Sequence, residues 1–122
     1  MIYKIGMLCK HFKGKTLLEK NIYRIEKVGV LGCEIDNSFI TYTGDNDLMF
    51  AQNLVIYSNV FQDYKLFARE YEDLCSILPI EMQELYHQKL RVEVLSDLEI
   101  NMINSDDFIN EKRKFVLSKF KN

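Results

Sequence analysis

The sequence predicts an α+β fold in which a small, strongly bent antiparallel sheet, of the SH3-like barrel type, is followed by C-terminal helices. Three observations support this prediction. Short segments rich in β-branched residues and tyrosine fill the first half, the apolar run 54–57 suits a strand buried on both faces, and helix-start signals are confined to the last third. The 122 residues fit a single domain, with a β-rich core at about 8–78 and a C-terminal strand and helices at about 79–122.

Four segments have the composition of strands. They are residues 20–30, 39–43, 54–57 and 64–69, with turn signals at 44–47 and 62–63 between them. The alternation within the first segment is imperfect, but it places Ile22 and Val28 on one face and Tyr23 and Ile25 on the other. Short strands separated by turns in this way predict a curled sheet.

The last third begins with a helix signal. Pro79 suits the first position of a helix that runs to about Gln88, because proline needs no backbone N–H partner there. The apolar stripe of this helix, near Met82, Leu85 and Tyr86, is expected to be buried.

One strand and a second helical region complete the chain. A short strand is expected at 90–95, and Ser96 with Glu99 fits a capping box that opens a helix. The last helix is expected from about Asp106 to Phe120, because acidic residues at its start and lysines at its end complement the helix dipole.

Charge is distributed unevenly along the chain. Residues 1–33 carry seven basic and two acidic groups, residues 34–110 carry four and fifteen, and residues 111–122 carry five and one. One interpretation is internal charge matching, and the other is a basic face for an anionic partner. The run Lys112–Lys114 is too short for a nucleic-acid arm and is expected on the solvated face of the last helix.

The chain has no targeting or membrane signal. No apolar run reaches the roughly 20 residues of a membrane-spanning helix. Lysines 4, 10 and 13 interrupt any apolar region of a signal peptide. A cytoplasmic protein without a membrane partner is therefore expected.

The cysteines and histidines do not form a recognisable reactive or metal-binding pattern. Cys9, Cys33 and Cys75 are an odd number without paired spacing, which predicts free thiols in a reducing compartment. A zinc site that adds His11 to these three is disfavoured by the same spacing. Nothing marks a thiolate activated by His11 or His87. Phosphate-binding, dinucleotide-binding, zinc-protease, calcium and nucleophile-elbow motifs are also missing from the sequence, so no catalytic residue, metal or cofactor is predicted.

Four short blocks in a fixed order carry a resemblance to a known family. They are Lys10–Gly14, Asn21–Ile25, Leu54–Tyr57 and Leu66–Tyr71. Over residues 8–78 the chain resembles the bacterial family catalogued as domain of unknown function 1653. It differs from that family at Glu70, where a proline commonly follows the arginine, and in a longer segment at 31–53. The resemblance implies a small β-rich domain of bacterial or phage origin, and it transfers no catalytic residue.

The same blocks supply the candidate ligand-binding residues: Lys10, His11, Lys13, Gly14, Tyr57, Arg69 and Tyr71. Lys10 and Lys13 beside Gly14 favour binding of an anion, because glycine lets a backbone N–H approach the ligand. The His11 imidazole is a donor that titrates near neutral pH, and the Arg69 guanidinium matches the geometry of a phosphate or carboxylate. The two tyrosines can stack on a base. These groups converge only if segment 8–14 lies beside the strand that carries Arg69.

A structural role for the same residues is the alternative. His11 and Phe12 would then form a packed corner with a hydrogen-bonded imidazole, and Arg69 would pair with a glutamate, either Glu26, Glu70 or Glu72.

We therefore expect a non-enzymatic binding module for an anionic ligand, a nucleotide or a nucleic acid. The alternative is a protein–protein interaction or regulatory subunit, self-association included, which uses the last helix or an aromatic surface at Phe61, Tyr64 and Phe67. A small thiol-dependent enzyme is the least favoured hypothesis, because no nucleophile–base pair emerges.

Overall fold

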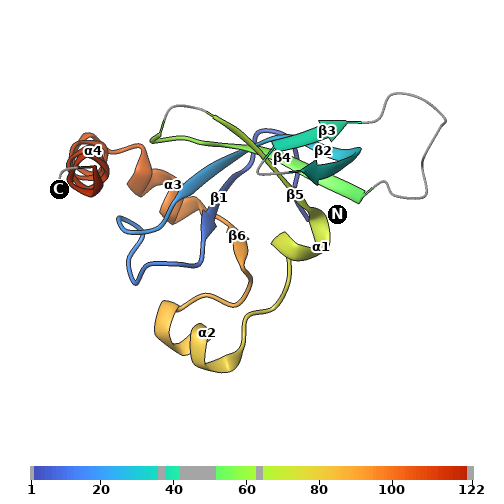
Figure 1. The fold of residues 1–122 in the computed structure, drawn as a ribbon. Helices are drawn as coiled ribbons and strands as arrows, with labels where there is room; N and C mark the ends of the chain where they lie inside the picture. The colour runs from blue at the N-terminus through green and yellow to red at the C-terminus, as the bar shows by residue number, and fades with distance from the viewer. Residues whose placement is uncertain (1, 36–37, 42–51, 63–64, 121–122) are drawn as a thin grey trace.

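The computed structural model describes residues 2–35, 38–41, 52–62 and 65–120. The elements are β1 (Leu8–His11), β2 (Ile22–Ile35), β3 (Ser38–Thr41), β4 (Gln52–Asn59), β5 (Leu66–Glu70), α1 (Tyr71–Leu74), α2 (Ile80–Tyr86), β6 (Val92–Val94), α3 (Asp97–Ile103) and α4 (Asp106–Lys119). All strands join one antiparallel sheet, followed by C-terminal helices, which confirms the predicted α+β class (Figure 1). The expected turns at 44–47 and 62–63, and Tyr64, fall wholly or partly outside the described residues.

The sheet is open, so the expected SH3-like barrel is not confirmed. The strand order is β5-β4-β2-β1-β6, with β3 paired to the C-terminal end of β2. In the described part of the chain no ladder joins the edge strands β5 and β6. The segment between them makes an isolated bridge of its own, between Ile77 and Leu90. β6 has three residues and pairs with β1, so it extends the sheet without reaching β5.

β2 bends sharply at two irregularities in its pairing with β4. The register shifts between Ile25 and Lys27 and again between Lys27 and Val30. Gly29 has a φ of 65°, a conformation that only glycine adopts without a steric cost. As a result Val28 packs against the core cluster that contains Ile25, so its predicted placement on the Ile22 face is wrong.

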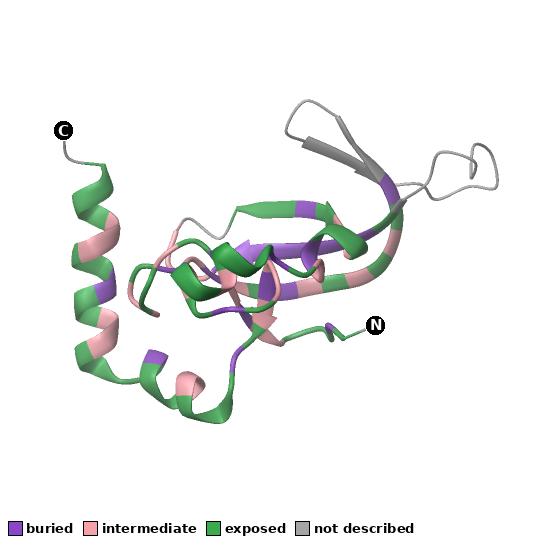
Figure 2. Ribbon diagram, turned by 90° about the horizontal axis from the view of Figure 1, so that it is seen from below, coloured by how far each residue is buried: buried purple, intermediate pink, exposed green. Residues whose placement is uncertain are grey.

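β4 is the centre of the core, as its apolar sequence predicts. The four residues Leu54–Tyr57 are all buried, which confirms a strand covered on both faces. Val55 packs with Ile25 on one face, and Ile56 packs with Ala68 on the other. Figure 2 shows the buried positions concentrated along the middle of the sheet.

The C-terminal helices begin where their capping signals predict. The Ser96 hydroxyl accepts the backbone N–H of Glu99 at 3.2 Å, and the Glu99 carboxylate accepts the N–H of Ser96 at 3.1 Å, so the capping box is confirmed. α4 begins at Asp106, as expected. These helices cover one end of the sheet through a second core cluster that includes Ile22 and Ile103. No helix in the described ranges is long and apolar enough to cross a membrane.

α2 differs most from its prediction. It begins at Ile80 with Pro79 as its N-cap, and none of its residues is buried. Met82 and Leu85, which were expected in the core, are 41% and 46% exposed. The helix lies at the tip of an excursion away from the sheet (Figure 1), and of its predicted apolar stripe Tyr86 is partly buried, with its ring centroid 5.4 Å from that of Phe12.

Candidate functional site

A row of rings crosses four adjacent strands on one face of the sheet. We call His11, Tyr23, Tyr57 and Phe67 the aromatic row. The ring centroids of His11 and Tyr23 are 6.2 Å apart, those of Tyr23 and Tyr57 4.7 Å, and those of Tyr57 and Phe67 5.8 Å. The last pair is stacked at an interplanar angle of 23° because Tyr57 and Phe67 are direct partners between β4 and β5.

Three cations lie within electrostatic reach of the His11 end of this row. Lys13, Arg69 and Arg91, here called the basic cluster, all act electrostatically on His11. Arg69 lies two residues after Phe67 in β5 and therefore shares its face of the sheet. Burial raises the pKa of the Tyr23 phenol, and the positive charge of Arg69 opposes that rise. The opening segment and the Arg69 strand therefore lie within electrostatic reach of each other, although β2 and β4 separate them.

The His11 imidazole is partly buried and uncharged at neutral pH. Its Nδ1 accepts the backbone N–H of Lys13 at 3.3 Å, which leaves the proton on Nε2. Burial, followed by the positive charges of the basic cluster, lowers its pKa to about 4. The expectation that His11 titrates near neutral pH is therefore wrong, whereas the hydrogen-bonded imidazole of the structural alternative is present.

No carboxylate neutralises the basic cluster within the described residues. The ion pair found there joins Lys10 to Glu99, outside the cluster. Glu26, one of the glutamates considered for Arg69, instead accepts a hydrogen bond from the Ser58 hydroxyl at 2.7 Å. The cluster therefore keeps its positive charge available to a ligand.

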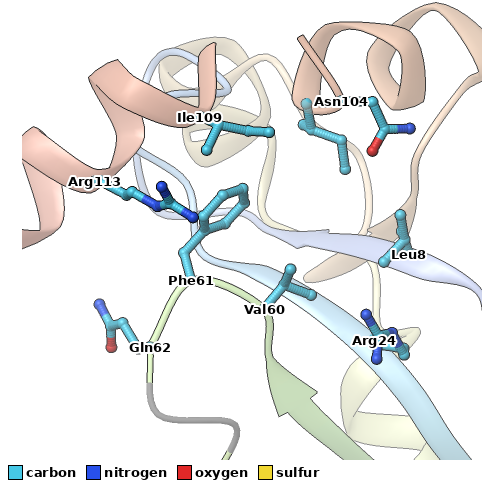
Figure 3. A pocket seen from close by; sticks show the side chains of 9 residues that line it. Leu8, Arg24, Val60, Phe61, Gln62, Asn104, Ile109 and Arg113 are labelled. Atoms are coloured by element: carbon cyan, nitrogen blue, oxygen red, sulfur yellow. The ribbon is translucent and has the colours of Figure 1, made fainter. Parts of the chain in front are cut away.

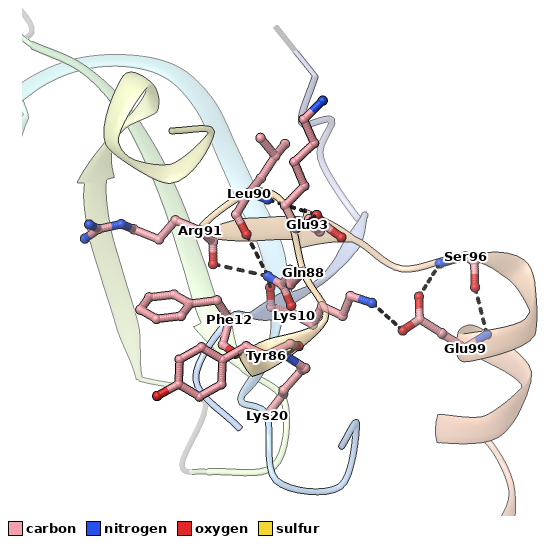
Figure 4. A network of polar contacts seen from close by, with 11 residues as sticks. Lys10, Phe12, Lys20, Tyr86, Gln88, Leu90, Arg91, Glu93, Ser96 and Glu99 are labelled. Carbon is pink, nitrogen blue, oxygen red and sulfur yellow. Dashed lines mark hydrogen bonds and ion pairs between the residues drawn. The ribbon is translucent and has the colours of Figure 1, made fainter. Parts of the chain in front are cut away.

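Lys10 lies on the opposite face of β1 from His11. Its ammonium donates to Glu99 at 2.6 Å, which ties β1 to the start of α3 (Figure 4). Burial alone would raise the pKa of Glu99, but the hydrogen bonds from Lys10 and Ser96 outweigh it and lower that pKa. The structure therefore separates Lys10 from the other candidate ligand-binding residues.

Gly14 closes the turn that follows β1. Its φ is 116°, and a Cβ atom at this position would lie 3.0 Å from the backbone carbonyl carbon of Glu19. Only glycine fits both the conformation and the space, so Gly14 shapes the loop that carries Lys13.

The two candidate tyrosines border the same core cluster but have different ring partners. Tyr57 is 7% exposed and stands between Tyr23 and Phe67 in the aromatic row. Tyr71 begins α1, where its hydroxyl accepts the N–H of Ile2 at 3.1 Å and its ring meets Tyr3 edge-on at 5.8 Å. The structure thus brings Tyr57, but not Tyr71, into the row.

Two buried lysines hold the loop from Phe12 to Lys20 in place. The Lys20 ammonium donates to the carbonyl oxygens of Phe12 at 2.8 Å and Tyr86 at 3.0 Å. The Lys112 ammonium donates to the carbonyl oxygens of Leu18 and Lys20. Lys112 is 2% exposed, so its expected place on a solvated helix face is wrong. Burial lowers its pKa to about 8.

Gln88 and Arg91 complete the base of the site, and no sequence signal marked either residue. The Gln88 amide nitrogen lies 3.1 Å from the Lys10 carbonyl oxygen and 2.9 Å from that of Leu90 (Figure 4). The guanidinium carbon of Arg91 lies 6.0 Å from the centroid of the Phe12 ring. Gln88 Oε1 and Arg91 Nε are buried without a hydrogen-bond partner among the described residues. Such unmet polar atoms are uncommon in folded proteins.

The thiols have no activating surroundings in the described part of the structure. Cys9 is fully buried, and burial raises its pKa to about 12. The Cys75 thiol lies 3.8 Å from the carbonyl oxygen of Glu72. The Cys33 side chain falls outside the described part. Among the described residues, no three histidine, cysteine or acidic side chains come together as metal ligands.

No protein-family model, curated protein or solved structure matches the chain.

Proposed function

We propose that the protein is a binding module for single-stranded nucleic acid. The observation that carries this proposal is the basic cluster, which has no carboxylate partner in the described residues and stands beside rings that cross four strands. Proteins that hold single strands combine cations for the phosphates with aromatic side chains for the bases.

The two ends of the aromatic row would serve the ligand differently. Phe67 is 38% exposed in the edge strand β5, where a base can stack on its ring. His11 at the other end is neutral and keeps a proton on Nε2 that can be donated to a phosphate or base oxygen. Tyr57 between them is buried and holds the spacing of the row.

The cations would bind the backbone of the strand. Arg69 offers a planar fork of donors, and Lys13 offers a compact charge on a loop fixed by Gly14. Each phosphate contact releases counterions, so binding should weaken steeply as salt rises.

Several broader expectations remain part of this proposal. We propose that the bent sheet is related to SH3-like barrels and that the chain belongs with the bacterial family it resembles. A cytoplasmic location suits both the nucleic-acid ligand and the buried, unpaired Cys9.

Fluorescence anisotropy with a labelled ten-nucleotide single strand tests the function. We expect Arg69→Gln and Lys13→Gln each to weaken binding about tenfold and to reduce the slope of log affinity against log salt by about one. Lys114→Gln is the control, because it removes a charge of the same sign from an exposed position on α4. Unchanged affinity in Arg69→Gln, or no binding by the natural protein at low salt, contradicts the proposal.

A second candidate function is protein–protein interaction through α2. Ile80 is 70% exposed and the nearby Ile77 65% exposed, and together with Met82 and Leu85 they leave apolar surface uncovered on this excursion. A second copy of the chain is the simplest partner. Light scattering after size exclusion should then show a dimer that Ile80→Glu converts to a monomer, and a natural protein that is monomeric at all concentrations rejects self-association.

A further inference from the structure

A cavity of about 410 Å³ lies on the opposite face of the sheet from the aromatic row. It is an open pocket lined by β1 and β2, the residues after β4, and helices α3 and α4 (Figure 3). Leu8, Val60, Ile103 and Ile109 give it an apolar floor. Its volume falls within the range of about 300–1,000 Å³ that is usual for small-molecule sites.

Two arginines stand on different walls of this cavity. Arg24 comes from β2, directly opposite Leu8 of β1, and Arg113 comes from α4. Among the described residues, no acidic side chain lines the cavity and neither guanidinium forms an ion pair. Two planar forks of donors beside an apolar floor favour a ligand with a multiply charged oxyanion and an apolar part.

An aromatic ring and two amides complete the lining. The Phe61 ring packs edge-to-face against Phe108, with 6.2 Å between the ring centroids. The backbone N–H of Phe61 donates to the side-chain oxygen of Asn59 at 3.1 Å. Gln62 and Asn104 add amide groups, each with donors and an acceptor. The Phe61 ring can stack on a planar ligand, and the two amides can form hydrogen bonds with the nitrogen and oxygen atoms at the edge of a heterocycle.

We propose that this cavity is a binding site for a small organic anion that joins a phosphate to a heterocyclic ring, the class of the nucleoside monophosphates. The phosphate is bound by one of the two arginines, which stand at opposite ends of the cavity, and the ring lies over the apolar floor against Phe61 (Figure 3). This site is separate from the proposed nucleic-acid surface, since consecutive residues of β2, Tyr23 and Arg24, point to opposite faces of the sheet.

Isothermal titration calorimetry with adenosine monophosphate, its three common counterparts, adenosine and inorganic phosphate tests the proposal. We expect at least one monophosphate to bind about tenfold more tightly than both adenosine and inorganic phosphate, because only the whole molecule uses both halves of the cavity. Either Arg24→Gln or Arg113→Gln, whichever removes the arginine that binds the phosphate, should weaken that binding about tenfold or more, the loss expected for a charge-assisted pair.

The control variants separate this site from others. Lys114→Gln removes an exposed charge from the residue next to Arg113 and should leave affinity within about twofold. Arg69→Gln should also leave it unchanged, even though it weakens binding of the oligonucleotide. The proposal is overturned if no monophosphate binds more tightly than inorganic phosphate, if a simple aromatic carboxylate such as benzoate binds as tightly, or if both arginine variants fold and bind like the natural protein. Circular dichroism melting of each variant establishes that it is folded.

Discussion

The two buried lysines that anchor the loop from Phe12 to Lys20 and the basic cluster, whose member Lys13 stands on that loop, are all cations, but they use their charges differently. In the loop region, the ammonium groups of Lys20 and Lys112 are buried and each donates to two backbone carbonyls. In the basic cluster, Lys13 and Arg69 are exposed and have no carboxylate partner in the described part of the molecule. The atoms that face a cation, rather than the number of cations, therefore distinguish a charge that maintains the fold from one that is available to a ligand.

The largest effect is expected at the buried charge of α4. Lys112→Met should lower the free energy of unfolding by about 3 kcal/mol, because it leaves two buried carbonyl oxygens without donors. Urea denaturation measures this loss. Lys114→Met, on the exposed side of the same helix, should change stability by less than about 0.5 kcal/mol. Equal stabilities of the two variants would remove the contrast between the regions.

The loop can also be tested through its backbone. Gly14→Ala should cost about 2 kcal/mol, because the new Cβ meets the Glu19 backbone and the positive φ is strained. Gly6→Ala is the matched control, because Gly6 also has a positive φ, 87°, but no atom lies within 4 Å of the position of an added Cβ. This substitution should lower the free energy of unfolding by about 1 kcal/mol. Thermal and chemical unfolding of the pair separates the steric part of the cost from the conformational part.

Acid should weaken the fold through His11. Its pKa is about 4 in the folded protein and 6.5 in the unfolded chain, so the unfolded state binds more protons between these values. Stability is therefore greatest above pH 6.5 and falls by roughly 1–2 kcal/mol as pH decreases toward 4, after allowance for solvent screening. His11→Asn keeps an acceptor for the Lys13 N–H and should remove this dependence. A His11 pKa near 6.5 in a proton NMR titration would contradict the prediction.

The smallest effect on stability is expected at the basic cluster. Arg69→Gln should change the free energy of unfolding by less than about 0.5 kcal/mol, because the side chain is exposed and unpaired within the described residues. Together with a loss of oligonucleotide affinity, that result would complete the contrast with Lys112. A stability loss comparable to that of Lys112→Met would instead assign Arg69 to the fold.

Structural features that depend on residues close together in the sequence were predictable. The capping box of Ser96 and Glu99, the start of α4 at Asp106 and the burial of Leu54–Tyr57 each depend on neighbouring residues, and all are confirmed. The exposure of α2 was not predictable, because an amphipathic pattern does not say whether a second layer exists. The shift of Val28 to another face follows from irregular pairing that the alternation alone does not reveal.

The candidate site was predictable to a similar extent. His11, Lys13 and Arg69 stand out locally, and the sheet brings them within electrostatic reach. Arg91 joins them because Phe12 donates its N–H to the Arg91 carbonyl beside the β1–β6 ladder, a pairing between distant segments. The carbonyl partners of Lys112 lie more than ninety positions away in the chain, so no local pattern could assign its role.

The contact of Lys112 with the loop also has a consequence for how the protein is made. Its partner Leu18 precedes it by 94 residues, and the β6 strand that covers the edge of β1 comes nearly as late. While the chain is still being synthesised, the Phe12–Lys20 loop therefore lacks its anchor and β1 keeps a free edge. The surface proposed to hold the single strand thus takes its final shape only after the last helix has emerged from the ribosome.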